Sequence, residues 1–393
     1  MSRRSALAHF LHAESTGGLA LLVATVVALV WANSPLSEAY ADLWHTGLTL
    51  GVGEVARTED LRHWVNDGLM TLFFLVVGLE IKRELVVGEL RDRKTVALPA
   101  MAALGGMVVP ALIYVAINLG DGGEPRGWAV PMATDIAFCV GVMAVLGSRV
   151  SSSVKLFLLT LAIVDDIGAI LVIALFYGGD ISIGPLLLSL ALLAAFGAMH
   201  RFTVPGWPAY AVVGIAAWAA LLASGIHATL AGVALGLLTR TDGRSGRESP
   251  VERAERVLHP WSSLLVVPVF ALANAGLALS AGGLRGAISS PVAVGVALGL
   301  VVGKLVGVLG ATWVGSRLGI GALPTGVRWG EIAGVASLAG VGFTVSLFVT
   351  GLAFDDAVAE QDATLGILAG SLVAAVVGSA ILWRMARVEP GEV

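Results

Sequence analysis

Long apolar stretches follow one another along the chain from Gly17 to Trp383, with short polar segments between them. A helix needs about 20 apolar residues to cross the hydrocarbon core of a bilayer. The stretches lie at 17–33, 62–81, 96–118, 127–147, 154–177, 182–199, 207–223, 226–239, 259–281, 291–315, 330–353 and 364–386. The pattern therefore predicts twelve membrane-spanning helices.

The seventh and eighth stretches are short, and together they resemble one long helix. Arg201 and Arg240 at the two ends favour an out-and-back pair, with the turn at Ser224-Gly225. Two short helices are the interpretation we adopt.

The composition agrees with a membrane protein. Of the 393 residues, 57% are apolar and 13% are charged, about half the usual charged share of a soluble domain. So few charges cannot cover the surface of a soluble protein of this length. We expect an all-α polytopic membrane protein with the lipid bilayer as its solvent, and no nucleic-acid partner. Cys139, the single cysteine, excludes a disulfide framework and is expected to be a small buried residue.

Basic residues are distributed unevenly between the two sides of the predicted bundle. If the N-terminus is cytoplasmic, most of the 24 lysines and arginines fall in inside segments. Those in outside segments are Arg57, Arg62, Arg126 and Arg285, and Lys304 lies within a span. Positive charge is normally retained in cytoplasmic loops. An odd number of helices would scramble this partition, so we predict both termini on the cytoplasmic side.

Two polar segments stand outside the spans. Residues 43–58 alternate apolar and polar positions around Gly51 and Gly53, which predicts a short β-hairpin on the outer surface. An exposed hairpin edge is a natural pairing site for a second copy of the chain. Residues 240–256 are polar and are expected to form a cytoplasmic loop between the eighth and ninth helices. We treat 1–393 as a single transporter domain.

Four charged residues lie deep within predicted spans: Asp135, Asp165, Asp166 and Lys304. Each would cost about 2.5–3.5 kcal/mol at the centre of a membrane helix. A structural ion pair with Lys304 would explain one aspartate and leave two unexplained. Three acids and one base therefore predict a site that takes up a cation or protons.

Helix geometry separates the roles of the adjacent aspartates. Neighbouring residues on a helix differ by about 100° in direction, so Asp165 and Asp166 cannot both face one partner. We expect Asp165 to pair with Lys304, and Asp166 to join Asp135 at the ion.

Two spans are expected to be interrupted. Pro131 precedes Asp135 in the fourth span and removes a helix hydrogen bond. In the eleventh span, Gly340 and Gly342 lie in a glycine-rich run. One interrupted helix in each of two three-helix groups, third to fifth and tenth to twelfth, predicts inverted repeats with the site between them. Asp135 would then offset the positive helix ends and Lys304 the negative ones.

The tenth span also carries glycines every four residues, at Gly295, Gly299, Gly303 and Gly307. This spacing predicts a smooth ridge for close contact with a neighbouring helix.

At these positions the sequence resembles the NhaA-type sodium/proton antiporters, over essentially the whole chain. The motifs that carry the resemblance are Ala133-Thr134-Asp135-Ile136-Ala137-Phe138, Leu161 to Ile170 (LAIVDDIGAI), Gly78 to Leu85 (GLEIKREL), Ser224 to Gly232 (SGIHATLAG) and Leu258-His259-Pro260-Trp261. Members of this family are known to contain inverted repeats. The family resemblance and the pattern of interrupted helices therefore do not support the predicted repeats independently. The resemblance implies a bacterial cytoplasmic (inner) membrane location and a homodimer through the outer hairpin. It also implies electrogenic exchange of Na⁺ or Li⁺ for protons, activated at alkaline pH.

The resemblance also implies roles for individual residues. Ion and proton binding would fall to Asp165, Asp166, Asp135, Thr134 and Lys304, with Na⁺ at Asp165 and Asp166. The pH response would involve Glu80, His227, Glu255 and His259. Structural alternatives remain open for these four, because Glu80 and Glu255 have arginines nearby in sequence and His227 could cap a helix. The chain departs from many relatives at Arg256, where they carry a histidine.

Sodium is a hard cation that prefers oxygen ligands, and protons compete for the same carboxylates. We therefore expect secondary active antiport by alternating access, serving pH and sodium homeostasis, without a cofactor and without enzyme activity. An intramembrane aspartyl protease is the enzymatic alternative, but its typical Gly-x-Gly-Asp motif is absent around all three aspartates. An ion-coupled symporter of related architecture is the other alternative.

Overall fold

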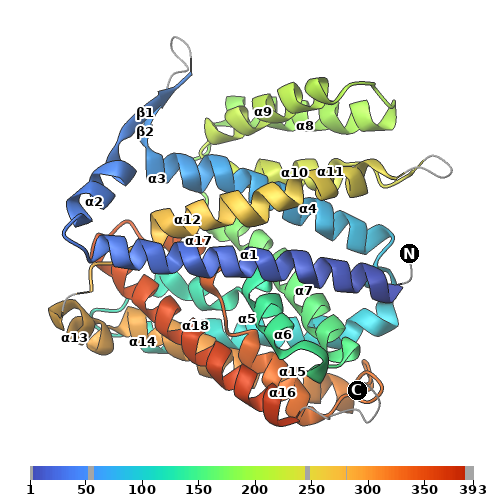
Figure 1. Cartoon of the computed structure of the whole chain (residues 1–393). Helices are drawn as coiled ribbons and strands as arrows, with labels where there is room; N and C mark the ends of the chain where they lie inside the picture. The colour runs from blue at the N-terminus through green and yellow to red at the C-terminus, as the bar shows by residue number, and fades with distance from the viewer. Residues whose placement is uncertain (1–2, 52–56, 244–247, 280, 386–393) are drawn as a thin grey trace. The chain divides into compact units, whose positions relative to one another are not determined.

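The computed structural model describes residues 3–51, 57–243, 248–279 and 281–385, and these are mostly helical (Figure 1). The α-helices are α1 (Arg3–Ala32), α2 (Ser37–His45), α3 (Leu61–Trp64), α4 (Met70–Val86), α5 (Arg93–Asn118), α6 (Ile136–Leu146), α7 (Ser152–Phe176), α8 (Ile183–Arg201), α9 (Trp207–Leu222), α10 (Thr229–Leu238), α11 (Pro250–Trp261), α12 (Val267–Asn274), α13 (Ala281–Ser289), α14 (Pro291–Leu298), α15 (Lys304–Arg317), α16 (Trp329–Leu338), α17 (Phe343–Ala353) and α18 (Ala357–Met385). Segments of 3-10 helix are η3 (Glu89–Arg91), η4 (Pro125–Met132) and η5 (Gly147–Arg149), and segments of π-helix are η2 (Val65–Leu69), η6 (Ser262–Val266) and η7 (Gly299–Gly303). The strands are β1 (Gly47–Leu50) and β2 (Arg57–Asp60).

Within the described residues, seven helices are long and apolar enough to cross a membrane, and nine if each of two bent pairs is one span. The bent pairs are α1 with α2 and α16 with α17. Two further apolar helices, α9 and α10, are shorter. The chain is thus a multi-pass membrane protein, and each of the twelve predicted ranges falls largely on helical residues.

The chain divides into two compact units. The first comprises Met1–Ala20, Asp92–Ala169 and Leu277–Val393, and the second comprises Leu21–Arg91 and Ile170–Gly276. Each unit is therefore assembled from segments that are far apart in the sequence.

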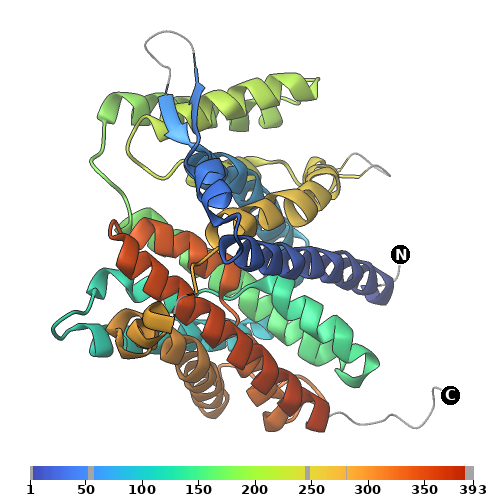
Figure 2. The ribbon, with the colours of Figure 1, turned by 60° about the vertical axis from the view of Figure 1, so that its left-hand side comes forward.

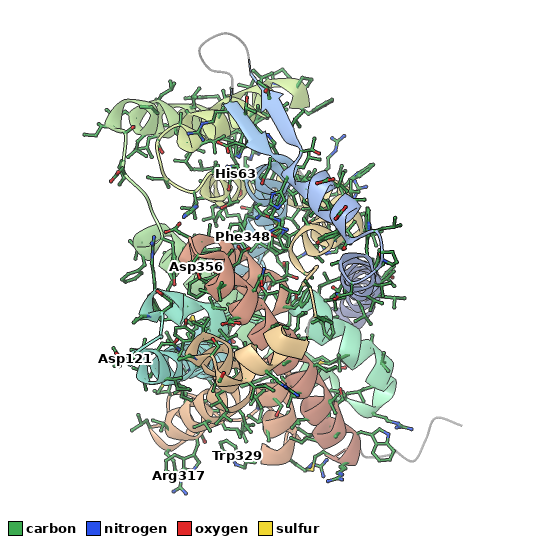
Figure 3. All side chains as sticks on the ribbon, turned by 90° about the vertical axis from the view of Figure 1, so that its left-hand side faces the viewer. His63, Asp121, Arg317, Trp329, Phe348 and Asp356 are labelled. Atoms are coloured by element: carbon green, nitrogen blue, oxygen red, sulfur yellow. The ribbon has the colours of Figure 1, made fainter. Side chains whose placement is uncertain are left out.

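In the first unit, α15 lies along α5, and α18 packs against both α14 and α16. The glycine ridge predicted on the tenth span makes the contact with α5. A side-chain carbon at Gly307 would lie 2.2 Å from the carbonyl oxygen of Gly105, and one at Gly303 would lie 2.7 Å from the Cα of Pro110. The ridge is confirmed as a packing surface, because any larger residue would push the helices apart. In Figure 3, the labelled side chains of Asp121 and Arg317 lie at the periphery of this unit.

The second unit contains the hairpin and the helices α2–α4 and α8–α12. α10 packs closely on α4, and α8 and α9 lie side by side (Figure 2). Strands β1 and β2 pair antiparallel, with Gly47 opposite Asp60 and Leu50 opposite Arg57. The predicted small sheet is therefore present, although residues 52–56 of the predicted hairpin lie outside the described residues.

The loop expected at 240–256 is shorter than predicted, because α11 begins at Pro250. Ser249 and Glu252 form a capping box, with the backbone N–H of Glu252 donating to the hydroxyl of Ser249 at 3.3 Å. Proline in the first helical turn adds to this start signal. The capping box and the proline can both be read from the sequence Ser249-Pro250-x-Glu252. They were overlooked because the segment is rich in charged residues and therefore resembles a loop. Residues 244–247 of the predicted loop lie outside the described residues.

A buried carboxylate–ammonium site between two broken helices

The fourth predicted span is interrupted just before Asp135. Residues Pro125–Met132 form a 3-10 helix that contains Pro131, and α6 starts only at Ile136. Between them Ala133 and Asp135 have extended backbone conformations, with ψ of 151° and 102°. Pro131 lacks an N–H and clashes with a preceding carbonyl in an α-helix, which explains why regular helix does not continue through this position.

The eleventh predicted span is interrupted between α16 and α17, which are bent by 45° relative to each other. Glycine is required at the break because two backbones approach closely there. A side-chain carbon at Gly342 would lie 2.9 Å from the carbonyl oxygen of Ala133. The two breaks are thus in direct contact.

Polar groups freed by one break are satisfied by the other. Three bonds run to carbonyl oxygens at the end of α16: the Thr134 hydroxyl donates to Ala339 at 2.8 Å, the Asp135 N–H to Val341 at 2.6 Å, and the Cys139 thiol to Leu338 at 3.0 Å. Backbone groups deep in a membrane protein must find such partners internally.

The carboxylate of Asp135 lies at two helix N-termini at once. Its Oδ1 accepts from the N–H of Phe138 at 2.9 Å and so caps α6. Its Oδ2 accepts from the N–H of Thr344 at 3.0 Å, and from the hydroxyl of the same residue, at the start of α17. A negative charge is stabilised at the positive end of a helix, so Asp135 compensates two such ends.

The buried ion pair lies beside these breaks. Lys304 Nζ donates to Asp165 Oδ2 at 2.7 Å and to the hydroxyl of Thr134 at 3.0 Å. The side chains of Lys304 and Asp165 are both fully buried. Lys304 thus pairs with Asp165, as expected from the sequence. A π-helical segment, η7, directly precedes Lys304, and π-bulges are frequent at functional sites.

One carboxylate oxygen of Asp165 accepts no hydrogen bond from another described residue. Asp165 Oδ1 is buried and has no hydrogen-bond partner among the described residues. Asp166, the next residue on α7, is 7% exposed. Two adjacent carboxyl side chains on α7 are therefore buried, and the Oδ1 atom of Asp165 is the oxygen available to a small cation.

Three of the four residues that the resemblance links to pH response lie in α4 and α11, which pack together in the second unit. Arg83 Nη1 contacts Glu255 Oε1 at 2.5 Å, and its Nη2 contacts Glu84 Oε1 at 3.0 Å. Glu80 lies one turn before Glu84 on α4, and His259 lies one turn after Glu255 on α11. Glu255 is therefore paired with an arginine of α4, whereas the structural alternative named arginines close to it in the sequence.

His227 lies in a separate part of the second unit. Its Nε2 contacts the carbonyl oxygen of Tyr177, just after the end of α7. The N–H of Gly179 also donates to the carbonyl of Gly225 at 3.1 Å, so the two loops are held together. The structure does not bring His227 into the Arg83 cluster.

Neither the bond of the Thr344 hydroxyl nor the hydrogen bond of Cys139 was predicted from the sequence. Thr344 is the second residue of α17, after the N-cap Gly342, and its hydroxyl donates to Asp135 instead of capping its own helix. The thiol contact of Cys139 had no sequence signature, because it depends on where the end of α16 lies in space.

Fold and site together define a multi-pass membrane protein with ionisable groups buried among broken helices, the arrangement of an ion-handling transporter. Comparison with known proteins identifies the family. The family model described as "Na+/H+ antiporter 1" matches residues 8–382, and the chain belongs to that family.

Named relatives agree with this assignment. The chain is 50% identical over 386 residues to the Na(+)/H(+) antiporter NhaA 1 of Pseudomonas putida, covering 98% of this chain and 97% of the relative. It is 47% identical over 389 residues to the NhaA antiporter of Pseudomonas fluorescens, covering 98% of both chains. It is also 47% identical over 375 residues to that of Shewanella loihica, covering 95% of both.

Proposed function

We propose that this protein is a secondary active antiporter in the bacterial inner membrane, extruding Na⁺ or Li⁺ in exchange for protons. The observation that carries the proposal is the enclosed pair Asp165 and Lys304, in which one carboxylate oxygen is free of hydrogen bonds among the described residues. Family membership with antiporters at about half identity supports the same activity.

The cargo would be held by oxygen atoms. Asp165 and Asp166 supply carboxylates, and the Thr134 hydroxyl already contacts Lys304 at 3.0 Å. A sodium ion would replace the ammonium group at Asp165, since both are monovalent cations that bind the same oxygens. Protons compete for these carboxylates, so the site holds either sodium or protons and changes side by alternating access.

Electrogenic exchange requires more than one protonation change for each Na⁺. Asp166 and either Asp165 or Lys304 are the groups we propose for these changes. Measuring transport in proteoliposomes under an imposed potassium diffusion potential tests this point. A rate that does not respond to the potential would refute electrogenic exchange.

Asp166→Asn is the decisive substitution. An amide cannot bind and release a proton, so the variant should show no pH change when NaCl or LiCl is added to acidified everted vesicles. Asp121→Asn is the control, because Asp121 is an exposed aspartate of the same unit. Exchange at the wild-type rate in Asp166→Asn would remove this aspartate from the mechanism. A requirement for an organic solute in the wild type would favour a symporter, and peptide cleavage would favour the protease.

We further propose twelve crossings with both termini cytoplasmic, and inverted repeats that each contain one interrupted helix. Nine candidate spans, counting each bent pair as one, become eleven with the short α9 and α10, and the consecutive helical segments α3, η2 and α4 supply the twelfth. Cys139 is buried, so Cys139→Ser gives a background for single cysteines in the loops. Labelling of any loop by a membrane-impermeant maleimide from the side opposite to its predicted one would refute the topology.

For the homodimer, we propose pairing through the hairpin. All four residues of β1 are exposed, which leaves a strand edge available to a second copy. A cysteine at Leu50 should form crosslinks between copies in membranes, whereas one at the exposed Leu119 of the first unit should not.

Alkaline activation would act through the cluster around Arg83. Glu255→Gln removes the carboxylate that contacts Arg83 at 2.5 Å, and we expect it to shift the pH profile of exchange. Glu248→Gln is a matched control, since Glu248 forms an exposed ion pair with Arg256 at 2.8 Å, near the start of the same helix. Identical pH profiles for the two variants would exclude the proposed role.

A further inference from the structure

The hydroxyl of Thr344 makes a contact that helix capping alone does not require. The backbone N–H of Thr344 already donates to Asp135 Oδ2 at 3.0 Å, and the hydroxyl donates to the same oxygen. With the N–H of Phe138 on Oδ1, at least three donors point at one carboxylate. A carboxylate offers about four lone-pair sites, so Asp135 has little capacity left for cargo.

This arrangement distinguishes Asp135 from Asp165. Asp165 keeps a buried oxygen without a hydrogen bond among the described residues, whereas both oxygens of Asp135 are bonded to helix starts. Asp135 therefore connects the starts of α6 and α17, which agrees with the expectation that it offsets positive helix ends.

Asp135 lies next to the group that binds Lys304. Thr134 precedes Asp135 in the chain, accepts from Lys304 Nζ at 3.0 Å and donates to the carbonyl of Ala339 at 2.8 Å. Thr134 and Asp135 lie between η4 and α6, outside regular helix. The backbone N–H of Asp135 donates to the carbonyl of Val341 at 2.6 Å and its carbonyl accepts from the N–H of Cys139 at 3.0 Å, and the bonds from Thr344 add the contacts that hold its carboxylate.

We infer that Thr344 is a positioning residue of the ion site, which fixes Asp135 and thereby holds Thr134 where it can serve the cation at Asp165. This inference rests on the proposed Na⁺/H⁺ exchange. Bonds to charged groups contribute more than neutral ones, so loss of the hydroxyl should weaken the site measurably. The expected effect is on apparent affinity, because the groups that carry charge remain in place.

The test compares Thr344→Val with Thr350→Val in proteoliposomes. Thr350 is equally buried on α17, but its hydroxyl donates to the carbonyl of Ser346 at 2.9 Å and to no aspartate. We expect Thr344→Val to raise the apparent KM for Na⁺ and Li⁺ about tenfold, with maximal rates within about threefold of wild type. Thr350→Val should leave KM within twofold, and Thr344→Ser should restore it.

Three results would overturn the inference: equal KM values for Thr344→Val and Thr350→Val, a fall in maximal rate with unchanged KM, or failure of serine to restore affinity. If the valine variant does not fold, Thr344→Ala removes the same hydroxyl with less steric change. Failure of both to fold, with Thr350→Val folded, would assign Thr344 a purely structural role and also overturn the inference. A wild-type protein that moves no protons on addition of sodium would instead refute the proposed function.

Discussion

Breaking the pair between Asp165 and Lys304 provides a quantitative test of the site's energetics. Both side chains are fully buried and 2.7 Å apart. Removing one partner of a buried ion pair costs about 3–5 kcal/mol, because the remaining charge loses its compensation. In Asp165→Asn, Lys304 keeps the Thr134 hydroxyl as an acceptor at 3.0 Å. We therefore expect the lower end of this range, about 3 kcal/mol.

Replacing both residues should cost far less. The double variant Asp165→Asn/Lys304→Met contains no uncompensated charge, and neutral replacements of buried pairs are often close to neutral in stability. With about 3 kcal/mol for each single substitution and almost none for the double variant, the coupling energy between the two sites should be about 6 kcal/mol, above the usual range of about 0.5–3 kcal/mol for residues in contact. Titration of purified protein with SDS in mixed micelles would measure the free energy of unfolding for all four proteins.

The exposed pair between Arg126 and Asp355 is the matched comparison in the same unit. Its atoms are 3.4 Å apart and its side chains are 58% and 96% exposed. Exposed pairs contribute less than about 1 kcal/mol. Should the coupling of the buried pair be no larger than that of the exposed pair, the argument that Lys304 compensates a buried carboxylate is refuted.

Two further predictions concern packing and capping. Gly307→Ala should lower the free energy of unfolding by about 1–3 kcal/mol, since its new carbon would lie 2.2 Å from the carbonyl oxygen of Gly105, whereas Gly310→Ala, with open space around it, should be neutral or stabilising in the same SDS titration. Asp92 caps α5, and a hydrogen bond from the Thr95 hydroxyl holds the pKa of its carboxyl below the ordinary value. The cap should stabilise the protein fully above the ordinary pKa and lose its effect as the pH falls through the lowered one; Asp92→Ala should therefore reduce the thermal midpoint at neutral pH, and an equal reduction at pH values below both pKa values would contradict this assignment.

Much of the architecture followed from the sequence, because membrane helices are specified by length and apolarity alone. Pro131 and Gly340 also predict interruptions of two helices from the sequence, since both residues act through local backbone geometry. The start of α11 was misjudged, because the charge of residues 250–256 outweighed the capping signal at Ser249. The polar composition of this segment predicted a loop, but the capping box of Ser249 and Glu252 starts a helix there.

The charged residues of the site could be predicted from the sequence, but most of the hydrogen bonds among them could not. Burial cost singled out the four charged residues, and helix geometry separated Asp165 from Asp166. Whether a carboxylate is an anchor or a ligand depends on the donors that surround it, and those come from distant segments. Thr344 is 209 residues away from Asp135 along the chain, so no local pattern could reveal that bond.

Lys304 connects cargo binding to the broken helices through a short series of bonds. Its ammonium group donates to Asp165 on α7 and to Thr134 in the first break, and Thr134 donates to Ala339 at the end of α16. A sodium ion at Asp165 would take over the oxygen ligands of the ammonium but could donate no hydrogen bond to Thr134. A ligand shifts a conformational equilibrium only through contacts that differ between the two states. The loss of the Lys304–Thr134 bond is such a difference, and in the proposed mechanism it makes the position of α16 depend on which cation occupies the site.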